Sequence, residues 1–424
     1  MLDTRDRTAA VNSRSFADSG GTSGNTSLPA GKSGSRDGLI PRDSDSDSDF
    51  ISGATSEEAS AQQRGLQQER TVAASLDNVL CGMRFDSHDP VSPGEALRTL
   101  VEHGYDRAPW LPLPGQGQTL ARWRVLAAVA ACDLSLVKLF EGHTDALAIL
   151  AELRGPTPPA ASRWAVWAAE PPDARVQAVR AGIRNNATDN PQVYLTGTKA
   201  WCSGAEAVSH ALVTVWLDNE PVLAAVAMDH ASISIDTSKW QAVGMQSTAS
   251  ADVRFDKTPA TLVGAAHAYV RRPGFWHGGA GIAACWYGAA AQIGRTLRAA
   301  CAQRADPHRL AHLGAVDVGL ASAAAVLRET AVQIDANPLA DAQREAMRAR
   351  LAVEEAATAV MTHATRTLGA GPLCRDARFA RALADLPVFL RQSHAERDLA
   401  SLGELVAAAD AVEAITPGAA PWTL

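Results

Sequence analysis

A run of short β-prone segments, enclosed by two helical blocks, most restricts the fold that this chain can adopt. The run occupies residues 161–262 and is interrupted by turn residues such as Asp218 and Asn219. Seven short strands within about 100 residues are typical of a compact antiparallel barrel or sandwich. The expected strands are Trp164–Glu170, Val176–Arg184, Gln192–Ser203, Ala211–Leu217, Val222–Met228, Ile233–Asp236 and Ala251–Phe255.

Helical periodicity precedes and follows this run. Residues 75–160 predict a helical domain, in which Ser92 and Glu95 have the spacing of a capping box. Residues 263–424 contain four long amphipathic segments with short links, which predict an up-and-down four-helix bundle. The expected helices are 96–102, 120–131 and 134–153 in the first block, and 276–304, 310–334, 339–367 and 377–412 in the second. The chain is therefore predicted to be an α+β protein with an N-terminal helical domain, a middle antiparallel β-barrel domain and a C-terminal four-helix bundle.

The first 74 residues differ in composition from the remainder of the chain. They are rich in Ser, Asp and Gly, contain few large apolar residues and include an alternating Ser–Asp run from Ser44 to Asp49. Such a segment cannot bury enough apolar surface to offset its chain entropy. We expect residues 1–74 to form a disordered tail.

Charge and cysteine content exclude several classes of protein. With 39 Lys and Arg against 46 Asp and Glu, the formal charge is −7, so the chain lacks the positive field that nucleic-acid binding requires. The six cysteines lie far apart without a CxxC pair, which argues against a zinc site or a disulfide framework. No apolar run of bilayer length and no signal-peptide pattern is evident, so we expect a cytoplasmic protein without a membrane contact.

Several short motifs in the chain are similar to landmarks of the acyl-CoA dehydrogenase family. The segment Leu195–Ala205, LTGTKAWCSGA, resembles the family's flavin-contacting strand, and Ala169-Glu170-Pro171 stands in the place of its T-E-P segment. The remaining landmarks occur in the family's order along the chain. They are Trp240–Ser250, which resembles W-x-x-x-G-M-R-x-S-x-T, Leu368–Gly371, which resembles G-G-x-G, and Cys374–Ala377, which contains R-D-A.

The resemblance implies a function and a set of cofactor contacts. Members of this family hold FAD, and a base removes the α-proton of an acyl thioester while a hydride passes to the flavin. An acyl thioester, an electron-accepting flavoprotein and a homodimer or homotetramer are therefore the implied partners. Trp201 matches the aromatic residue that packs on the isoalloxazine, and Ser203 matches the hydroxyl that bonds flavin N5; without the resemblance, they would be a core aromatic and a turn residue. The implied cofactor-binding residues are Ala169, Trp201, Cys202, Ser203, Gly369 and Gly371.

The catalytic base is the main departure from the family pattern, since the usual Glu after R-D-A is missing. Counting along the chain leads to Ala384 and Asp385, where Pro387 is expected to keep Leu386 out of a helical conformation. The family's alternative position, early in the first bundle helix, offers only His277. Either side chain can move a proton if its pKa suits. Their structural alternatives are a helix-end cap for Asp385 and a polar residue at a helix crossing for His277.

Two other functions remain open on the same fold. Relatives that hydroxylate small substrates with a flavin need no α-proton base, and a non-catalytic partner subunit needs no active site. His394 and Asp398 are four residues apart, so they share a helical face and can form a pair that orients a base or donates near a flavin. The structural alternative for this pair is a salt bridge on a solvated or interhelical face.

Overall fold

Helices precede the strands in the computed structural model, which describes residues 75–86, 89, 91–171, 174–181 and 191–413. A helical segment over 75–82 leads to α3 (Val91–Glu102), α4 (Thr119–Cys132) and α5 (Leu134–Glu152). The predicted tail, residues 1–74, lies outside the described residues. The predicted capping box is wrong, because α3 begins before Ser92. Asp89 instead accepts a hydrogen bond from the Val91 amide at 2.9 Å, and the Ser92 hydroxyl donates to the Asp89 carbonyl.

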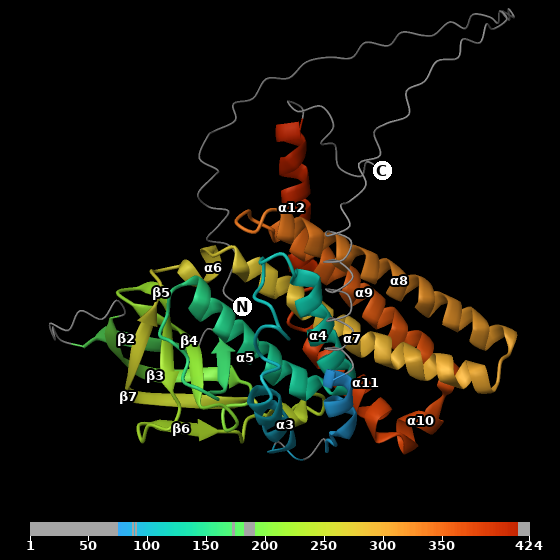
Figure 1. The fold of residues 1–424 in the computed structure, drawn as a ribbon, viewed down its shortest axis with the longest axis horizontal. Helices are drawn as coiled ribbons and strands as arrows, with labels where there is room; N and C mark the ends of the chain where they lie inside the picture. The colour runs from blue at the N-terminus through green and yellow to red at the C-terminus, as the bar shows by residue number, and fades with distance from the viewer. Residues whose placement is uncertain (1–74, 87–88, 90, 172–173, 182–190, 414–424) are drawn as a thin grey trace, which may run out of the picture. The chain divides into compact units, whose positions relative to one another are not determined.

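Five of the seven strands pair around a ring, and the other two are added at its edges; the strands lie on the left in Figure 1. β4 pairs with β5, β5 with β7, β7 with β3, β3 with β2, and β2 returns to β4; β1 is added beside β4, and β6 beside β7. The expectation of a wholly antiparallel sheet is wrong at two places, because β1 and β2 both run parallel to β4. The strands are β1 (Trp164–Trp167), β2 (Val176–Arg180), β3 (Gln192–Cys202), β4 (His210–Leu217), β5 (Glu220–Ala227), β6 (Ile233–Asp236) and β7 (Ala251–Val263).

The second helical block packs around its first long helix. A short helix, α6 (Ala268–Arg271), comes first. The long helix α7 (Gly274–Gln303) then contacts α4 and α5 as well as α8 (Pro307–Ala336), α9 (Gln343–Leu368) and α11 (Ala377–Leu390). The approach to α4 is so close that a Cβ at Gly288 would overlap the carbonyl oxygen of Ala127. The helices that precede and follow the strands therefore share one core.

The last predicted helix, 377–412, is two helices. Following α10 (Ala370–Arg375), α11 (Ala377–Leu390) ends at a turn, and α12 (Glu396–Glu413) starts after Ala395, which has a φ of 48°. The expectation for Pro387 is also wrong, because the proline lies inside α11. Phe389 and Leu390, which follow the proline, are buried. Their packing stabilises the last turn of α11 although Pro387 has no backbone N–H to donate.

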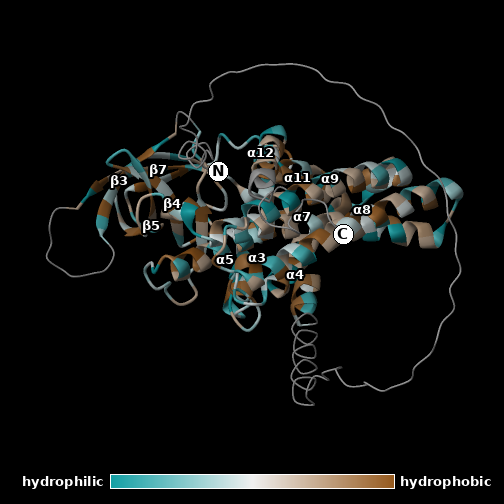
Figure 2. Cartoon of the chain, turned by 90° about the horizontal axis from the view of Figure 1, so that it is seen from above, coloured by the Kyte–Doolittle hydropathy of each residue, from teal (hydrophilic) through white to brown (hydrophobic). Residues whose placement is uncertain are grey.

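α8 leaves much of its apolar surface uncovered. By length and composition alone, α8 could cross a membrane. Only 17% of its most apolar 18-residue stretch is buried. Leu310, Val318 and Val332 on it are exposed, and Figure 2 shows hydrophobic residues along this helix.

Candidate functional site

A buried ion pair joins two of the motif segments recognised in the sequence. The ammonium of Lys199, in β3, lies 3.2 Å from a carboxylate oxygen of Glu170, which follows β1. Lys199 also donates to the hydroxyl of Thr214 at 2.6 Å, and the Trp216 indole donates to Glu170 at 3.1 Å. Burial lowers the pKa of Lys199, while Glu170 opposes that change. The pair fixes the loop that carries Ala169 against β3, the strand that carries Trp201.

The end of β3 presents an aromatic side chain outward. Trp201 has a φ of 59° and is 61% exposed, so it is not a core aromatic residue. The next side chain points the opposite way: Cys202 is fully buried, and its thiol donates to the Lys199 carbonyl. Burial raises the pKa of the Cys202 thiol. Of these two predicted contacts, Trp201 can offer its ring to a ligand, whereas Cys202 can offer only its backbone.

A chain of hydroxyl groups leads inward from Ser203. The Ser203 and Ser250 hydroxyls are 2.8 Å apart, and the Ser250 and Thr248 hydroxyls are 3.0 Å apart. The Thr248 hydroxyl then donates to the Met245 carbonyl at 2.8 Å. Ser203 is therefore more than a turn residue, because it is connected by side-chain hydrogen bonds to the segment that resembles W-x-x-x-G-M.

Asp385 lies at the other end of this connection. The backbone amide of Met245 donates to its Oδ1 atom at 2.5 Å. The helix-end interpretation of Asp385 is wrong, because the residue lies inside α11 and bonds to a distant loop. Burial raises the pKa of Asp385 to about 6; the Met245 bond and Arg381 oppose that rise, and Asp133 adds to it. The structure thus links Ser203 and Asp385, two of the predicted site residues, through Met245.

Asp385 lines a cavity of about 230 Å³ between the end of α4, α7 and α11. An ion pair of 3.0 Å between Arg381 and Asp133 forms part of its wall, and Arg378 donates to the Ala131 carbonyl nearby. The wall is mixed in polarity; besides Asp385, its polar side chains include Asp133, Gln292, Thr296, Asp376, Arg378 and Arg381.

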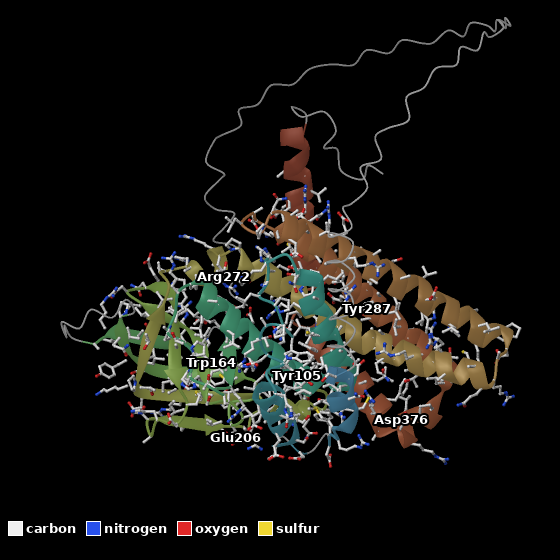
Figure 3. The ribbon with its side chains drawn as sticks, in the orientation of Figure 1. Tyr105, Trp164, Glu206, Arg272, Tyr287 and Asp376 are labelled. Atoms are coloured by element: carbon white, nitrogen blue, oxygen red, sulfur yellow. The ribbon has the colours of Figure 1, made fainter. Side chains whose placement is uncertain are left out.

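His277 does not belong to this cavity. It lies in the first turn of α7, whereas the cavity meets that helix from Ala289 onward, about 18 Å further along at 1.5 Å per residue. Figure 3 likewise shows Arg272, just before α7, well apart from Asp376 at the start of α11. His277 is 3% exposed, its Nε2 atom has no partner among the described residues, and burial lowers its pKa. The two predicted bases therefore occupy different places.

The two predicted glycine contacts also lie away from Trp201. Gly369, with a φ of 65°, ends α9, and Gly371 lies in α10. A Cβ on either would meet no atom within 4 Å. Figure 1 shows α10 on the side of the helices away from the strands. Within one chain, these glycines do not join the Trp201 region.

The predicted contact between His394 and Asp398 is confirmed, but the expected shared helical face is wrong, because His394 lies in the turn before α12. Their side chains are 3.4 Å apart, and Asp398 also accepts from the His394 amide at 3.0 Å, which caps the start of α12. Burial lowers the pKa of His394. Sequence reasoning missed the buried Arg350, which donates to the carbonyls of Gly279 and Gln392, both at 2.9 Å, and so ties this turn to α7. Nothing in the local pattern of α9 identifies Arg350.

Comparisons with known proteins show the fold. No family model and no curated protein matches the chain. Among solved structures, the KijD3 complex with FMN and a dTDP-amino-keto sugar has a TM-score of 0.63 at 18% identity, covering 80% of this chain and 94% of its own. FMN-bound TdsC from Paenibacillus sp. A11-2 has a TM-score of 0.65 at 17% identity, covering 79% and 96%.

Glutaryl-CoA dehydrogenase from Mycobacterium smegmatis matches with a TM-score of 0.63 at 18% identity, covering 76% of this chain and 90% of that one. The expected acyl-CoA dehydrogenase-like fold, with a β-rich middle and a helical C-terminal region, is therefore confirmed. At these identities the likeness concerns the fold, which a dehydrogenase and the dibenzothiophene monooxygenase TdsC share.

Proposed function

We propose that this protein is a flavin-dependent oxidoreductase. The residues at the end of β3 fit a flavin, because Trp201 exposes a flat ring there and the Ser203 hydroxyl lies two residues on. The Glu170–Lys199 pair anchors the residue next to Ala169, whose backbone would then contact the ring system. The sequence motifs favour FAD, and FMN is the alternative because KijD3 and TdsC carry it.

The leading reaction is α,β-dehydrogenation of an acyl thioester, with Asp385 as the base. The observation that carries it is a buried carboxylate, with a pKa raised to about 6, on the wall of a cavity and linked to Ser203. Such a group is ionised at neutral pH and still basic enough to take a proton. The Met245 amide holds Oδ1 and leaves Oδ2 to receive that proton. A bound flavin would accept the hydride.

The cavity limits the acyl group that this reaction would use. A volume of about 230 Å³ is smaller than the roughly 300–1,000 Å³ of drug-sized ligand pockets. Five charged side chains, including Asp133 and Arg381, line it. We therefore propose a short acyl thioester, or another small molecule, as the substrate. The expected electron-accepting flavoprotein, homodimer or homotetramer and cytoplasmic location are part of the same proposal.

The second candidate is a flavin-dependent monooxygenase. TdsC supports it, since that protein is a monooxygenase of the same fold. A further support is the position of His394, which is half-buried, paired with Asp398 and fixed through Arg350 to α7. In this reaction His394 would donate a hydrogen bond, and Asp385 would serve only to attach the Met245 loop to α11.

A single spectroscopic experiment separates these functions. The purified protein is expected to be yellow, and one short acyl-CoA is expected to bleach it without oxygen. Asp385→Asn should slow the bleaching strongly, while Asp317→Asn, on the exposed face of α8, serves as the control. Yellow protein that no thioester reduces would refute the dehydrogenase and favour oxygenation. Colourless protein that takes up neither FAD nor FMN would instead indicate a non-catalytic subunit.

A further inference from the structure

Two histidines meet between α8 and α9, away from the site described above. The Nδ1 atoms of His312 and His363 are 2.8 Å apart. Their ring centroids lie 5.1 Å apart, with the ring planes at 52°. Both side chains are half-buried, and the two helices pack against each other. A pair of ring nitrogens is thus held at one point of a helix interface.

We propose that His312 and His363 together bind a divalent transition-metal ion such as Zn²⁺. Imidazole nitrogen coordinates such ions at about 2.0–2.1 Å, so two neighbouring ligands at right angles lie about 2.9 Å apart. A tetrahedral angle would need a separation of about 3.3 Å, so the two nitrogens would have to move apart by about 0.5 Å. The observed 2.8 Å is close to the first value. The separation therefore matches two ligands of one metal ion.

Metal binding would change which ring nitrogens of this pair carry hydrogen. Without a metal, one Nδ1 must carry a hydrogen and donate it to the other, since two facing lone pairs repel. Coordination requires both Nδ1 lone pairs, so this hydrogen moves to the Nε2 atom of its own ring. Both imidazoles remain neutral, and no oxidant or reductant is needed.

The remaining coordination positions determine the character of this site. In the described part of the chain, no group of three or more His, Cys, Asp or Glu residues is placed to hold a metal ion. Water would therefore complete the coordination, and the site would be weaker than a closed structural zinc site. Two nitrogen ligands select Zn²⁺, Ni²⁺ or Cu²⁺ over Mg²⁺ and Ca²⁺. Because the ligands come from α8 and α9, binding would stabilise the packing of these helices.

The test uses the full chain, metal-free after EDTA treatment, with ZnCl₂ as the probe in a buffer that does not coordinate metal. Calorimetry is expected to show one saturable site per chain, and the Tm is expected to rise with Zn²⁺ concentration. His312→Gln and His363→Gln should each weaken binding at least about tenfold. His308→Ala is the matched control, because His308 is exposed one turn earlier on the same helix.

Three results would overturn the proposal. Wild-type protein without saturable Zn²⁺ binding would leave the pair as a hydrogen bond only. An equal loss of Zn²⁺ affinity in His308→Ala would assign the binding site to the start of α8 instead. Unchanged affinity in both Gln variants would place the ion elsewhere. The Tm of each variant in EDTA verifies that it folds, so weak binding is not mistaken for unfolding, and MgCl₂ in place of ZnCl₂ should give no signal.

Discussion

At the scale of single residues, burial makes Asp385 a pH-sensitive group. Its folded pKa, about 6, lies above the ordinary value of 3.8, so the folded state holds the proton more tightly than the unfolded state. The ionised carboxylate therefore lowers the free energy of unfolding progressively as the pH rises from about 4 to 6. At pH 8 this ionisation costs roughly 2–3 kcal/mol of the free energy of unfolding, and we expect Asp385→Asn to abolish that cost. Urea unfolding at pH 4.5 and 8 checks this, and parallel pH dependence in both proteins would contradict it.

The same ionisation governs the proposed reaction. If Asp385 is the base, the rate at which an acyl thioester bleaches the flavin should rise with pH and reach half its maximum near pH 6. Stopped-flow bleaching between pH 5 and 8 measures it. A rate that is flat across this range would assign proton removal to another group.

A second prediction at this scale concerns the contribution of the Glu170–Lys199 ion pair to stability. Lys199→Met leaves the Glu170 carboxylate without its ammonium partner in a buried position. Removing one member of a buried ion pair costs roughly 3–5 kcal/mol. We expect Tm to fall strongly in Lys199→Met and to recover in part when Glu170→Gln is added. If the double variant is no more stable than Lys199→Met, the two side chains are not coupled.

Sequence motifs could single out Trp201, Ser203 and Asp385 as candidates, because motifs specify side chains. The spacing of His394 and Asp398 likewise predicted the contact between them, which the structure contains. Arg350 could not be found, because its partners are main-chain carbonyls that lie 71 and 42 residues away along the chain. A carbonyl has no signature in the sequence, so a side chain that binds one is seen only after folding.

At the scale of elements, Gly244 determines how α11 meets the Met245 loop. A Cβ at this position would overlap the carbonyl oxygen of Ala384. We expect Gly244→Ala to displace α11, lower Tm and break the bond between Met245 and Asp385. Gly403→Ala, in α12, is the control, because a Cβ there meets no atom within 4 Å. Equal thermal unfolding of the two variants would show that the Gly244 contact relaxes without cost.

Periodicity predicted where elements lie better than how they connect or pair. The long helix α7 begins and ends within a few residues of its predicted bounds. The break at Ala395 was missed, because the turn from α11 to α12 contains no Gly or Pro that would mark the end of a helix. The parallel pairing of β1 with β4 was missed as well, since a period of two specifies the buried face of a strand and not its neighbour.

At the scale of the whole molecule, the sequence predicted the order of helical, β and helical blocks, but not that α4 packs on α7. The close contact at Gly288 depends on residues about 160 positions apart, which no local pattern reveals. The cavity beside Asp385 is a product of this packing, since α4, α7 and α11 form its walls. The position of Asp385 was predictable, but the space in front of it was not.

The volume of the cavity beside Asp385 should limit the size of the acyl group in the proposed reaction. A cavity of about 150 Å³ holds benzene, so one of about 230 Å³ holds an acyl chain of up to about eight carbons. We expect butyryl-CoA to bleach the flavin faster than palmitoyl-CoA, with kcat/KM as the measure. Gln292→Ala should widen the range toward longer chains. Equal rates across the series would mean that the acyl group binds outside this cavity.

The ring of strands has one weak seam, where β2 joins β4 through a single residue pair, Gln177 and Trp216. On its other edge β2 pairs with β3 along its whole length, and β4 pairs with β5 along all of β4. Local opening transitions concentrate where the fewest bonds must break. Deuterium should therefore enter the amides on the β4-facing edge of β2 well before those between β4 and β5. The ring of strands would then open and close at the β2–β4 edge while its other edges stay paired.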